Sequence, residues 1–181
     1  MTEKLSLGVI IGNRDFFPDK LVAECRSEIL TILQQHQIDP ILLEVNDTKL
    51  GGVETFDDAR KCASLFQQHR DKIMGVLVIL PNFGDERGVA ETLKLAKLDV
   101  PVLIQAYPDD LDKLDVARRR DSWCGKISVC NNLYQYGIKY SITEKHVIHP
   151  SDASFSDDLK KFIGVCRVVK GLRNVRIGAI G

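Results

Sequence analysis

The sequence predicts an α/β protein built on a doubly wound parallel sheet of about five strands. Two observations carry this prediction. Short apolar runs rich in β-branched residues recur along the 181 residues, and segments with apolar residues at helical spacing separate them. Strands that alternate with amphipathic helices pair in parallel through right-handed crossovers, so helices cover both faces of the sheet. Because 44% of the residues are apolar, the chain can bury one sizeable core.

Four of the expected strands are apolar along nearly their whole length, which is typical of strands buried on both faces. They comprise residues 5–12, 41–45, 75–80 and 101–105. A fifth strand is expected at 140–142 or at 146–148, and the sequence leaves both positions open. This alternation predicts a flavodoxin-like order of strands.

The expected helices lie between these strands and turn one apolar face inward. The first begins near Pro18, which suits a first helical turn, and ends at Asp39-Pro40. Asp57 or Asp58 is expected to cap the second. Its inward residues are expected to be Ala59, Cys62, Ala63, Phe66 and Ile73. Two further helices are expected around residues 89–96 and 122–136.

The C-terminal part of the chain predicts one more helix and the start of a second unit. Ser154 and Asp157 resemble a capping box before a helix that turns its apolar residues inward. Val175 to Gly181 then has the composition of a buried strand, with no helix after it. We therefore expect residues 1–173 to form a flavodoxin-like N-terminal domain and residues 174–181 to begin a truncated second domain.

Composition argues against several classes of partner. The 25 Lys and Arg residues balance the 25 Asp and Glu residues, so neither nucleic acid nor an anionic membrane is an expected partner. No apolar run approaches the roughly 20 residues of a membrane helix, and no signal peptide is recognisable. The five cysteines are odd in number and form no C-x-x-C pair, which suggests buried thiols in a reducing compartment. We expect a soluble, cytoplasmic protein.

Ligands of open parallel sheets bind beyond the carboxyl ends of the strands, where the strand order reverses. Two expected loops there, residues 13–17 and 82–87, combine hydrogen-bonding side chains with phenylalanines. Such a combination suits a small polar ligand. It equally suits turns whose aromatic residues fold back on the core, and the sequence does not separate the two interpretations.

Other kinds of site lack residues that they need. The third strand ends at Asn82 rather than at the aspartate of a phosphotransfer domain, and Ile127 stands where a phosphate-binding loop needs a hydroxyl. Gly12 alone does not make a dinucleotide-binding motif. His146 and His149 would point to opposite faces of a strand, so a shared metal ion is not expected.

Residues 121–134 are the most individual segment, with the only Trp, a lysine and two adjacent asparagines. A structural interpretation has Asp121 or Ser122 cap a helix that packs apolar residues inward. Those inward residues would be Trp123, Ile127, Cys130 and Tyr134. A functional interpretation makes Lys126, Asn131 and Asn132 polar contacts to a partner or ligand.

One family matches these motifs. The run D-x-x-C-G-K-x-S-V-C-N-N-L at 121–133, after P-N-F-G at 81–84 and P-V-L-I-Q at 101–105, resembles the N-terminal domain of the L-fucose/L-arabinose isomerase family. The resemblance spans nearly all of the chain. It implies a flavodoxin-like domain followed by a second α/β domain, whose first strand would be 175–181.

The resemblance also implies a reaction. Family members interconvert aldoses and ketoses by proton transfer between adjacent carbons, assisted by a divalent metal, usually manganese. The carboxylates and histidine that they use lie in later domains, so this chain should bind no cofactor and be inactive alone. We expect it to line the substrate site of a neighbouring subunit in a homo-oligomer. The residues expected at that rim are Asn13, Arg14, Asn82 and Phe83, with Lys126, Asn131 and Asn132 at the rim or the subunit interface.

A second function remains open. The same domain could be a metal-free module that binds a sugar or a small anion as a sensor or carrier. The sequence specifies neither the sugar nor the number of subunits.

Overall fold

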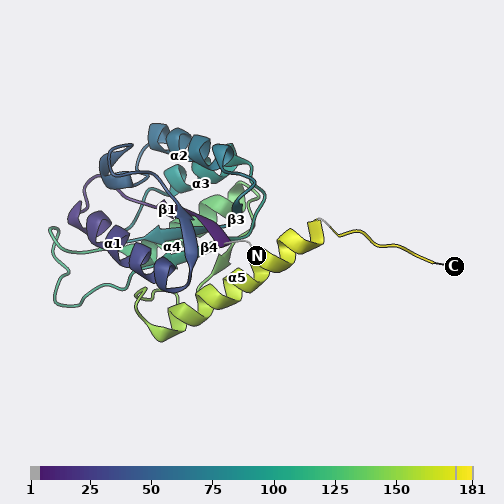
Figure 1. The fold of residues 1–181 in the computed structure, drawn as a ribbon. Coiled ribbons are helices and arrows are strands. Elements are labelled where there is room, and N and C mark those ends of the chain that lie inside the picture. Colours follow the sequence, from purple (N-terminus) through teal and green to yellow (C-terminus); the bar gives the residue numbers. More distant parts are fainter. Residues whose placement is uncertain (1–4, 174, 181) are drawn as a thin grey trace.

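The computed structural model describes residues 5–173 and 175–180. Within this part of the chain, five strands form one sheet in which every neighbouring pair is parallel, in the order β2-β1-β3-β4-β5 (Figure 1). The strands are β1 (Leu5–Ile11), β2 (Ile38–Ile41), β3 (Ile73–Leu80), β4 (Val102–Ala106) and β5 (Ser141–Ile142). This order confirms the predicted doubly wound, flavodoxin-like fold.

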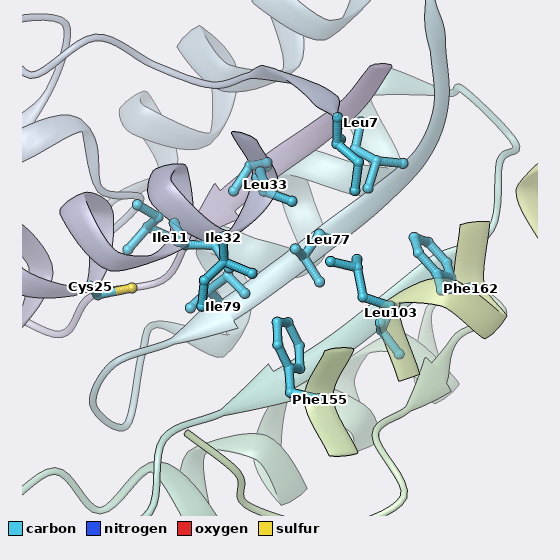
Figure 2. Close-up of a cluster of buried hydrophobic side chains, with 14 of the residues drawn as sticks. Leu7, Ile11, Cys25, Ile32, Leu33, Leu77, Ile79, Leu103, Phe155 and Phe162 are labelled. Atoms are coloured by element: carbon cyan, nitrogen blue, oxygen red, sulfur yellow. The ribbon is translucent and has the colours of Figure 1, made fainter. Parts of the chain in front are cut away.

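Helices cover both faces of the sheet. They are α1 (Lys20–Gln35), α2 (Phe56–Gln68), α3 (Glu86–Ala96), α4 (Ser122–Gln135) and α5 (Ala153–Arg173), with a short 3-10 turn η1 (Lys49–Gly51). The first and last helices, α1 and α5, share one hydrophobic core with the sheet, part of which Figure 2 shows. The other three, α2, α3 and α4, share the second core, on the opposite face.

The central strand β3 shows why two cores form. Its side chains alternate between the faces, because successive residues of a strand point in opposite directions. Leu77 and Ile79 enter the core under α1 and α5, whereas Val76 and Val78 enter the core under α2, α3 and α4. At Gly75 the backbone meets α5 so closely that a Cβ would lie 2.5 Å from the Cys166 sulfur.

The second strand lies earlier than the sequence predicts. We expected it at 41–45, with Asp39-Pro40 ending the helix before it, but β2 spans Ile38–Ile41 and contains both residues. The helix α1 already ends before Gln37, whose φ of 56° is left-handed. Because β2 is the edge strand, Pro40 can lack an N–H without breaking the sheet.

Two of the predicted helix caps are wrong in detail. Thr55, rather than Asp57 or Asp58, is the N-cap of α2, and its side chain and that of Asp58 form a reciprocal capping box. Ile73, expected on the inner face of that helix, belongs to β3. Ser154 is the second residue of α5 and cannot be its cap, because the helix begins at Ala153.

Two predictions concern the C-terminal part of the chain. The fifth strand takes the first of its two predicted positions, at Ser141–Ile142. Residues 175–180 are exposed and form no strand, contrary to the prediction, because they extend away from the sheet and lie beside no strand (Figure 1). Gly181 lies outside the described residues, and the second domain stays a prediction. No helix in the described ranges is long and apolar enough to cross a bilayer.

Candidate functional site

The strand order reverses between β1 and β3, and two asparagines meet there. Asn13 follows β1 and Asn82 follows β3. The Asn82 Nδ2 group donates to Asn13 Oδ1 at 2.6 Å, and Asn13 Nδ2 donates to Glu54 Oε2 at 3.0 Å. The backbone N–H of Gly84 donates to Asn82 Oδ1 at 2.9 Å. This hydrogen-bond chain joins the loops after β1, before α2 and after β3.

Both asparagine side chains are buried. The backbone supports the same arrangement, because Asn13 N donates to Val53 O, and Val53 N donates to Ile11 O. In the chain as it stands, these two predicted rim residues therefore hold the loops together and are not open to solvent.

Arg14 and Phe83 form the accessible part of the same edge. Arg14 Nη1 donates to Glu86 Oε2 at 2.9 Å, and the Arg14 guanidinium lies 4.7 Å from the centre of the Phe83 ring. Glu86 is the first residue of α3, where the helix dipole favours a negative charge. The result is a partly exposed surface with a charged pair beside an aromatic ring.

Glu54 adds a titratable group to this edge. Burial raises the pKa of its carboxyl, while the hydrogen bond from Asn13 and the charge of Lys49 act in the opposite direction. Glu54 is thus closer to protonation at neutral pH than an exposed glutamate would be.

Lys126 is buried, and its side chain reaches the segment that follows β5. Its Nζ donates to Thr143 Oγ1 and to the His146 carbonyl oxygen, both at 2.7 Å. Burial lowers the pKa of the Lys126 ammonium to about 8, against the opposing influence of Cys130 and Asp158. Lys126 therefore fastens α4 to the segment between β5 and α5.

The two asparagines of α4 lie apart from the place where the strand order reverses, between β1 and β3. Asn131 is exposed, and Asn132 donates from Nδ2 to the Ser128 carbonyl oxygen at 3.1 Å. Both are in the second half of α4, whereas the helix begins at the carboxyl edge of the sheet. The structure thus brings together Asn13, Arg14, Asn82 and Phe83, but not the three predicted residues of α4.

The orientation of α4 also corrects the structural interpretation of this helix. Trp123, Ile127 and Tyr134, expected to pack inward, are exposed, and Cys130 is half-buried. The inward positions are Ser122, Gly125, Lys126, Val129 and Leu133. Asp121 precedes the helix with a left-handed φ of 52° and makes no side-chain cap. The apolar residues of α4 are therefore divided between two sides, with Val129 and Leu133 inward and Trp123, Ile127 and Tyr134 outward.

Comparison with known proteins identifies the domain. The profile of the fucose/sulfoquinovose isomerase N-terminal domain matches residues 8–173. The chain belongs to this family. A search of curated proteins finds no match. The matched range begins within β1 and ends with the last residue of α5, so it takes in all five helices and nearly all of both cores.

In this family member, the sequence did not reveal every residue of the edge. Glu54 and Glu86 are distant from Asn13 and Arg14 in sequence, and only the folded sheet brings them together. Gly125 was visible within the family motif, and its role is steric, because a Cβ there would overlap the Phe83 carbonyl group. The start of α4 thereby fixes the backbone that carries Phe83.

The described residues of this isomerase domain do not fit a metal centre. No three His, Cys, Asp or Glu side chains among them lie close enough together to hold an ion. A divalent cation bound with several protein ligands would need residues other than these.

Proposed function

We propose that this chain is the N-terminal domain of an aldose–ketose isomerase. We also propose that the edge of the sheet where the strand order reverses, between β1 and β3, forms part of the rim of a substrate site. The substrate would be a pentose, a deoxyhexose or a related aldose. The family match over residues 8–173 is the observation that carries the proposal.

The arrangement at the edge supports distinct roles for the predicted rim residues. Arg14 is held by Glu86 and Phe83 and still has N–H donors that can reach sugar hydroxyls. The Phe83 ring offers an apolar surface that excludes water beside them. Asn13 and Asn82 act through the backbone, because their hydrogen bonds keep the loops that carry Arg14 and Phe83 in place.

The reacting groups would come from outside this chain. Isomerisation through an enediol needs a base to move the proton and a cation, manganese in the family chemistry, to polarise the sugar oxygens. The described residues offer no cluster for that ion. We propose that later domains supply both and that this domain faces the site of a neighbouring subunit in a homo-oligomer.

The proposal is tested with a protein in which this domain is joined to the later domains, supplied with Mn²⁺ and assayed for ketose formation over a broad panel of aldoses. Arg14→Gln should lower kcat/KM about 10- to 100-fold, mainly through KM, because a charge-assisted hydrogen bond contributes about 1.5–3 kcal/mol. The matched control is Arg60→Gln on the exposed side of α2. The Arg60 guanidinium lies 3.7 Å from the exposed Asp57 carboxylate, so this substitution should have little effect.

Two results would contradict the proposal. Equal activity of the Arg14 and Arg60 variants would remove Arg14 from the rim. Inactivity toward every aldose would favour the metal-free binding module instead.

A further inference from the structure

A serine, a histidine and a glutamate lie side by side near the start of α5. Ser151 Oγ is 2.7 Å from His149 Nδ1, and His149 Nε2 is 3.4 Å from Glu28 Oε2. Glu28 belongs to α1, whereas His149 and Ser151 lie in the segment between β5 and α5. One imidazole ring therefore has a hydroxyl at one nitrogen and a carboxylate at the other. We call these three residues the Ser151 cluster.

The backbone decides which ring nitrogen of His149 carries the proton. The N–H of Ser151 donates to His149 Nδ1 at 3.3 Å, and because a backbone N–H can only donate, Nδ1 is the accepting nitrogen. The proton of the neutral ring is then on Nε2, on the side of Glu28. His149 Nδ1 thus faces the Ser151 hydroxyl as an unprotonated base, which is the arrangement that activates a serine as a nucleophile.

Tyr107 orients the other two polar groups from the core. Its hydroxyl donates to Glu28 Oε2 at 2.7 Å, and its ring packs edge-on against His149 with 5.1 Å between the ring centres. Burial raises the pKa of the Tyr107 hydroxyl, so the hydroxyl keeps the proton that it donates. Tyr107 is 1% exposed, whereas the side chains of Glu28 and His149 are 42% and 37% exposed. A buried residue therefore holds the carboxylate and the imidazole in place while both stay accessible.

The Ser151 cluster lines a cavity of about 550 Å³ between α1 and the start of α5. Residues of α1 and its C-cap His36 form one side, and residues between His149 and Ser156 form the other. A hydrogen bond of 3.1 Å between Ser156 Oγ and His36 Nε2 joins the two sides. Pockets of roughly 300–1,000 Å³ hold small organic ligands. The cavity is thus large enough for a small substrate beside the Ser151 hydroxyl.

We propose that this cluster hydrolyses small carboxylic esters, with Ser151 as nucleophile, His149 as base and Glu28 as the group that orients the ring. Ser151 Oγ bonds to the ester carbonyl carbon while its proton passes to His149 Nδ1, and Glu28 stabilises the imidazolium. The bond to the alcohol oxygen then breaks, and that oxygen takes the proton from Nδ1. Water next gives a proton to Nδ1 and attacks the acyl group. The carboxylic acid leaves, and the proton returns to Ser151 Oγ.

The first turn of α5 suits the charge that develops in this reaction. The ester carbonyl oxygen becomes negative when Ser151 attacks, and N–H groups already in position stabilise it. Ala153 and Ser154 are the first residues of α5, and N–H groups at the start of a helix have no carbonyl partner within it. The helix dipole adds partial positive charge at this end. This activity goes beyond the isomerase function, and none of these residues belongs to the rim.

The test is hydrolysis of p-nitrophenyl acetate by the 181-residue chain, without sugar or metal. Ser151→Ala and His149→Gln should each lower kcat/KM at least about 100-fold, because each removes a group that the attack requires. Exposed imidazoles hydrolyse activated esters slowly by themselves, so matched controls are needed. Ser64→Ala and His69→Gln, both at α2 and away from the cavity, should leave kcat/KM unchanged.

A second measurement separates a nucleophilic serine from a histidine that acts alone. Phenylmethylsulfonyl fluoride loses fluoride to an activated serine, which keeps the sulfonyl group, and peptide mass spectrometry should find that group on Ser151 in wild type but not in His149→Gln. Far-ultraviolet circular dichroism should show that the variants keep the fold. Hydrolysis no faster than that of Ser151→Ala, or a Ser151 without label, would overturn the proposal and reduce the contact to a turn before α5. Neither result bears on the isomerase assay.

Discussion

Replacing Lys126 by Met should change how stability depends on pH. The side chain is fully buried, and its pKa falls from 10.5 to about 8 in the folded chain. Between these two values the unfolded chain binds a proton that the folded chain does not. The contribution of Lys126 to the free energy of unfolding is therefore lowest below about pH 8 and rises as the pH increases toward the ordinary lysine pKa.

The expected change follows from the size of the shift. From about pH 7 to about pH 9.5, the lysine should add about 2 kcal/mol to the free energy of unfolding. Met has a similar stem and no proton to lose, so the difference between wild type and Lys126→Met isolates this contribution from those of the buried cysteines. For a chain of this length, about 2 kcal/mol corresponds to roughly 4–8 °C in Tm.

The assay is urea unfolding of both proteins at the two pH values, under reducing conditions. Wild type should gain about 2 kcal/mol on the variant as the pH rises. The reasoning would be refuted if the free energies of unfolding of wild type and Lys126→Met differed by the same amount at both pH values. That result would mean that the Lys126 ammonium keeps its ordinary pKa despite its burial.

Three further substitutions test packing and hydrogen bonding, each by the midpoint of urea unfolding. Gly125→Ala should destabilise by about 3 kcal/mol, because the new methyl group overlaps the Phe83 carbonyl group. Thr55→Ala should cost about 1 kcal/mol by removing the cap of α2. Asn82→Ala should cost about 1–3 kcal/mol, since it leaves the Gly84 N–H and the Asn13 carboxamide oxygen buried without this partner.

Matched controls accompany these substitutions. Gly164→Ala on the exposed side of α5 meets no atom within 4 Å and should stabilise by about 0.5–1 kcal/mol. Ser154→Ala should have little effect, because Ser154 lies within α5 and is not its cap. Asn131→Ala removes an exposed carboxamide and should also be nearly neutral. If a control destabilised as much as its counterpart, the specific contact would not be the cause.

The alternation of apolar runs and helical periods was enough to predict the sheet. The strands β1, β3 and β4 are buried on both faces, and their apolar residues marked them clearly. The edge strand β2 was misplaced because Asp39-Pro40 usually ends structure, and only its place in the sheet shows that a proline is tolerated there. Burial leaves a strong pattern in a sequence, whereas edge position leaves little.

The site was predictable only in its location. Two loops at the reversal of strand order could be named, and Asn13 and Asn82 do meet there. The structure adds that both asparagines are buried and that Asn13 donates a hydrogen bond to Glu54. Both facts depend on the three-dimensional arrangement of the loops, which the sequence does not give. The helix α4 misled for a physical reason, because Lys126 occupies an inward position that periodicity assigns to apolar residues.

The hydrogen bonds between Gly84 and Glu54 all run in one direction. Each carboxamide has a donating end and an accepting end, and an ionised carboxylate at the terminus can only accept. Rotating either asparagine amide by half a turn would set donor against donor and acceptor against acceptor. The direction of the series is therefore fixed at both ends, by the Gly84 N–H, which can only donate, and by Glu54, which accepts. A proton taken up by Glu54 would replace the charge-assisted hydrogen bond from Asn13 with a weaker neutral one and leave the order of donors and acceptors unchanged.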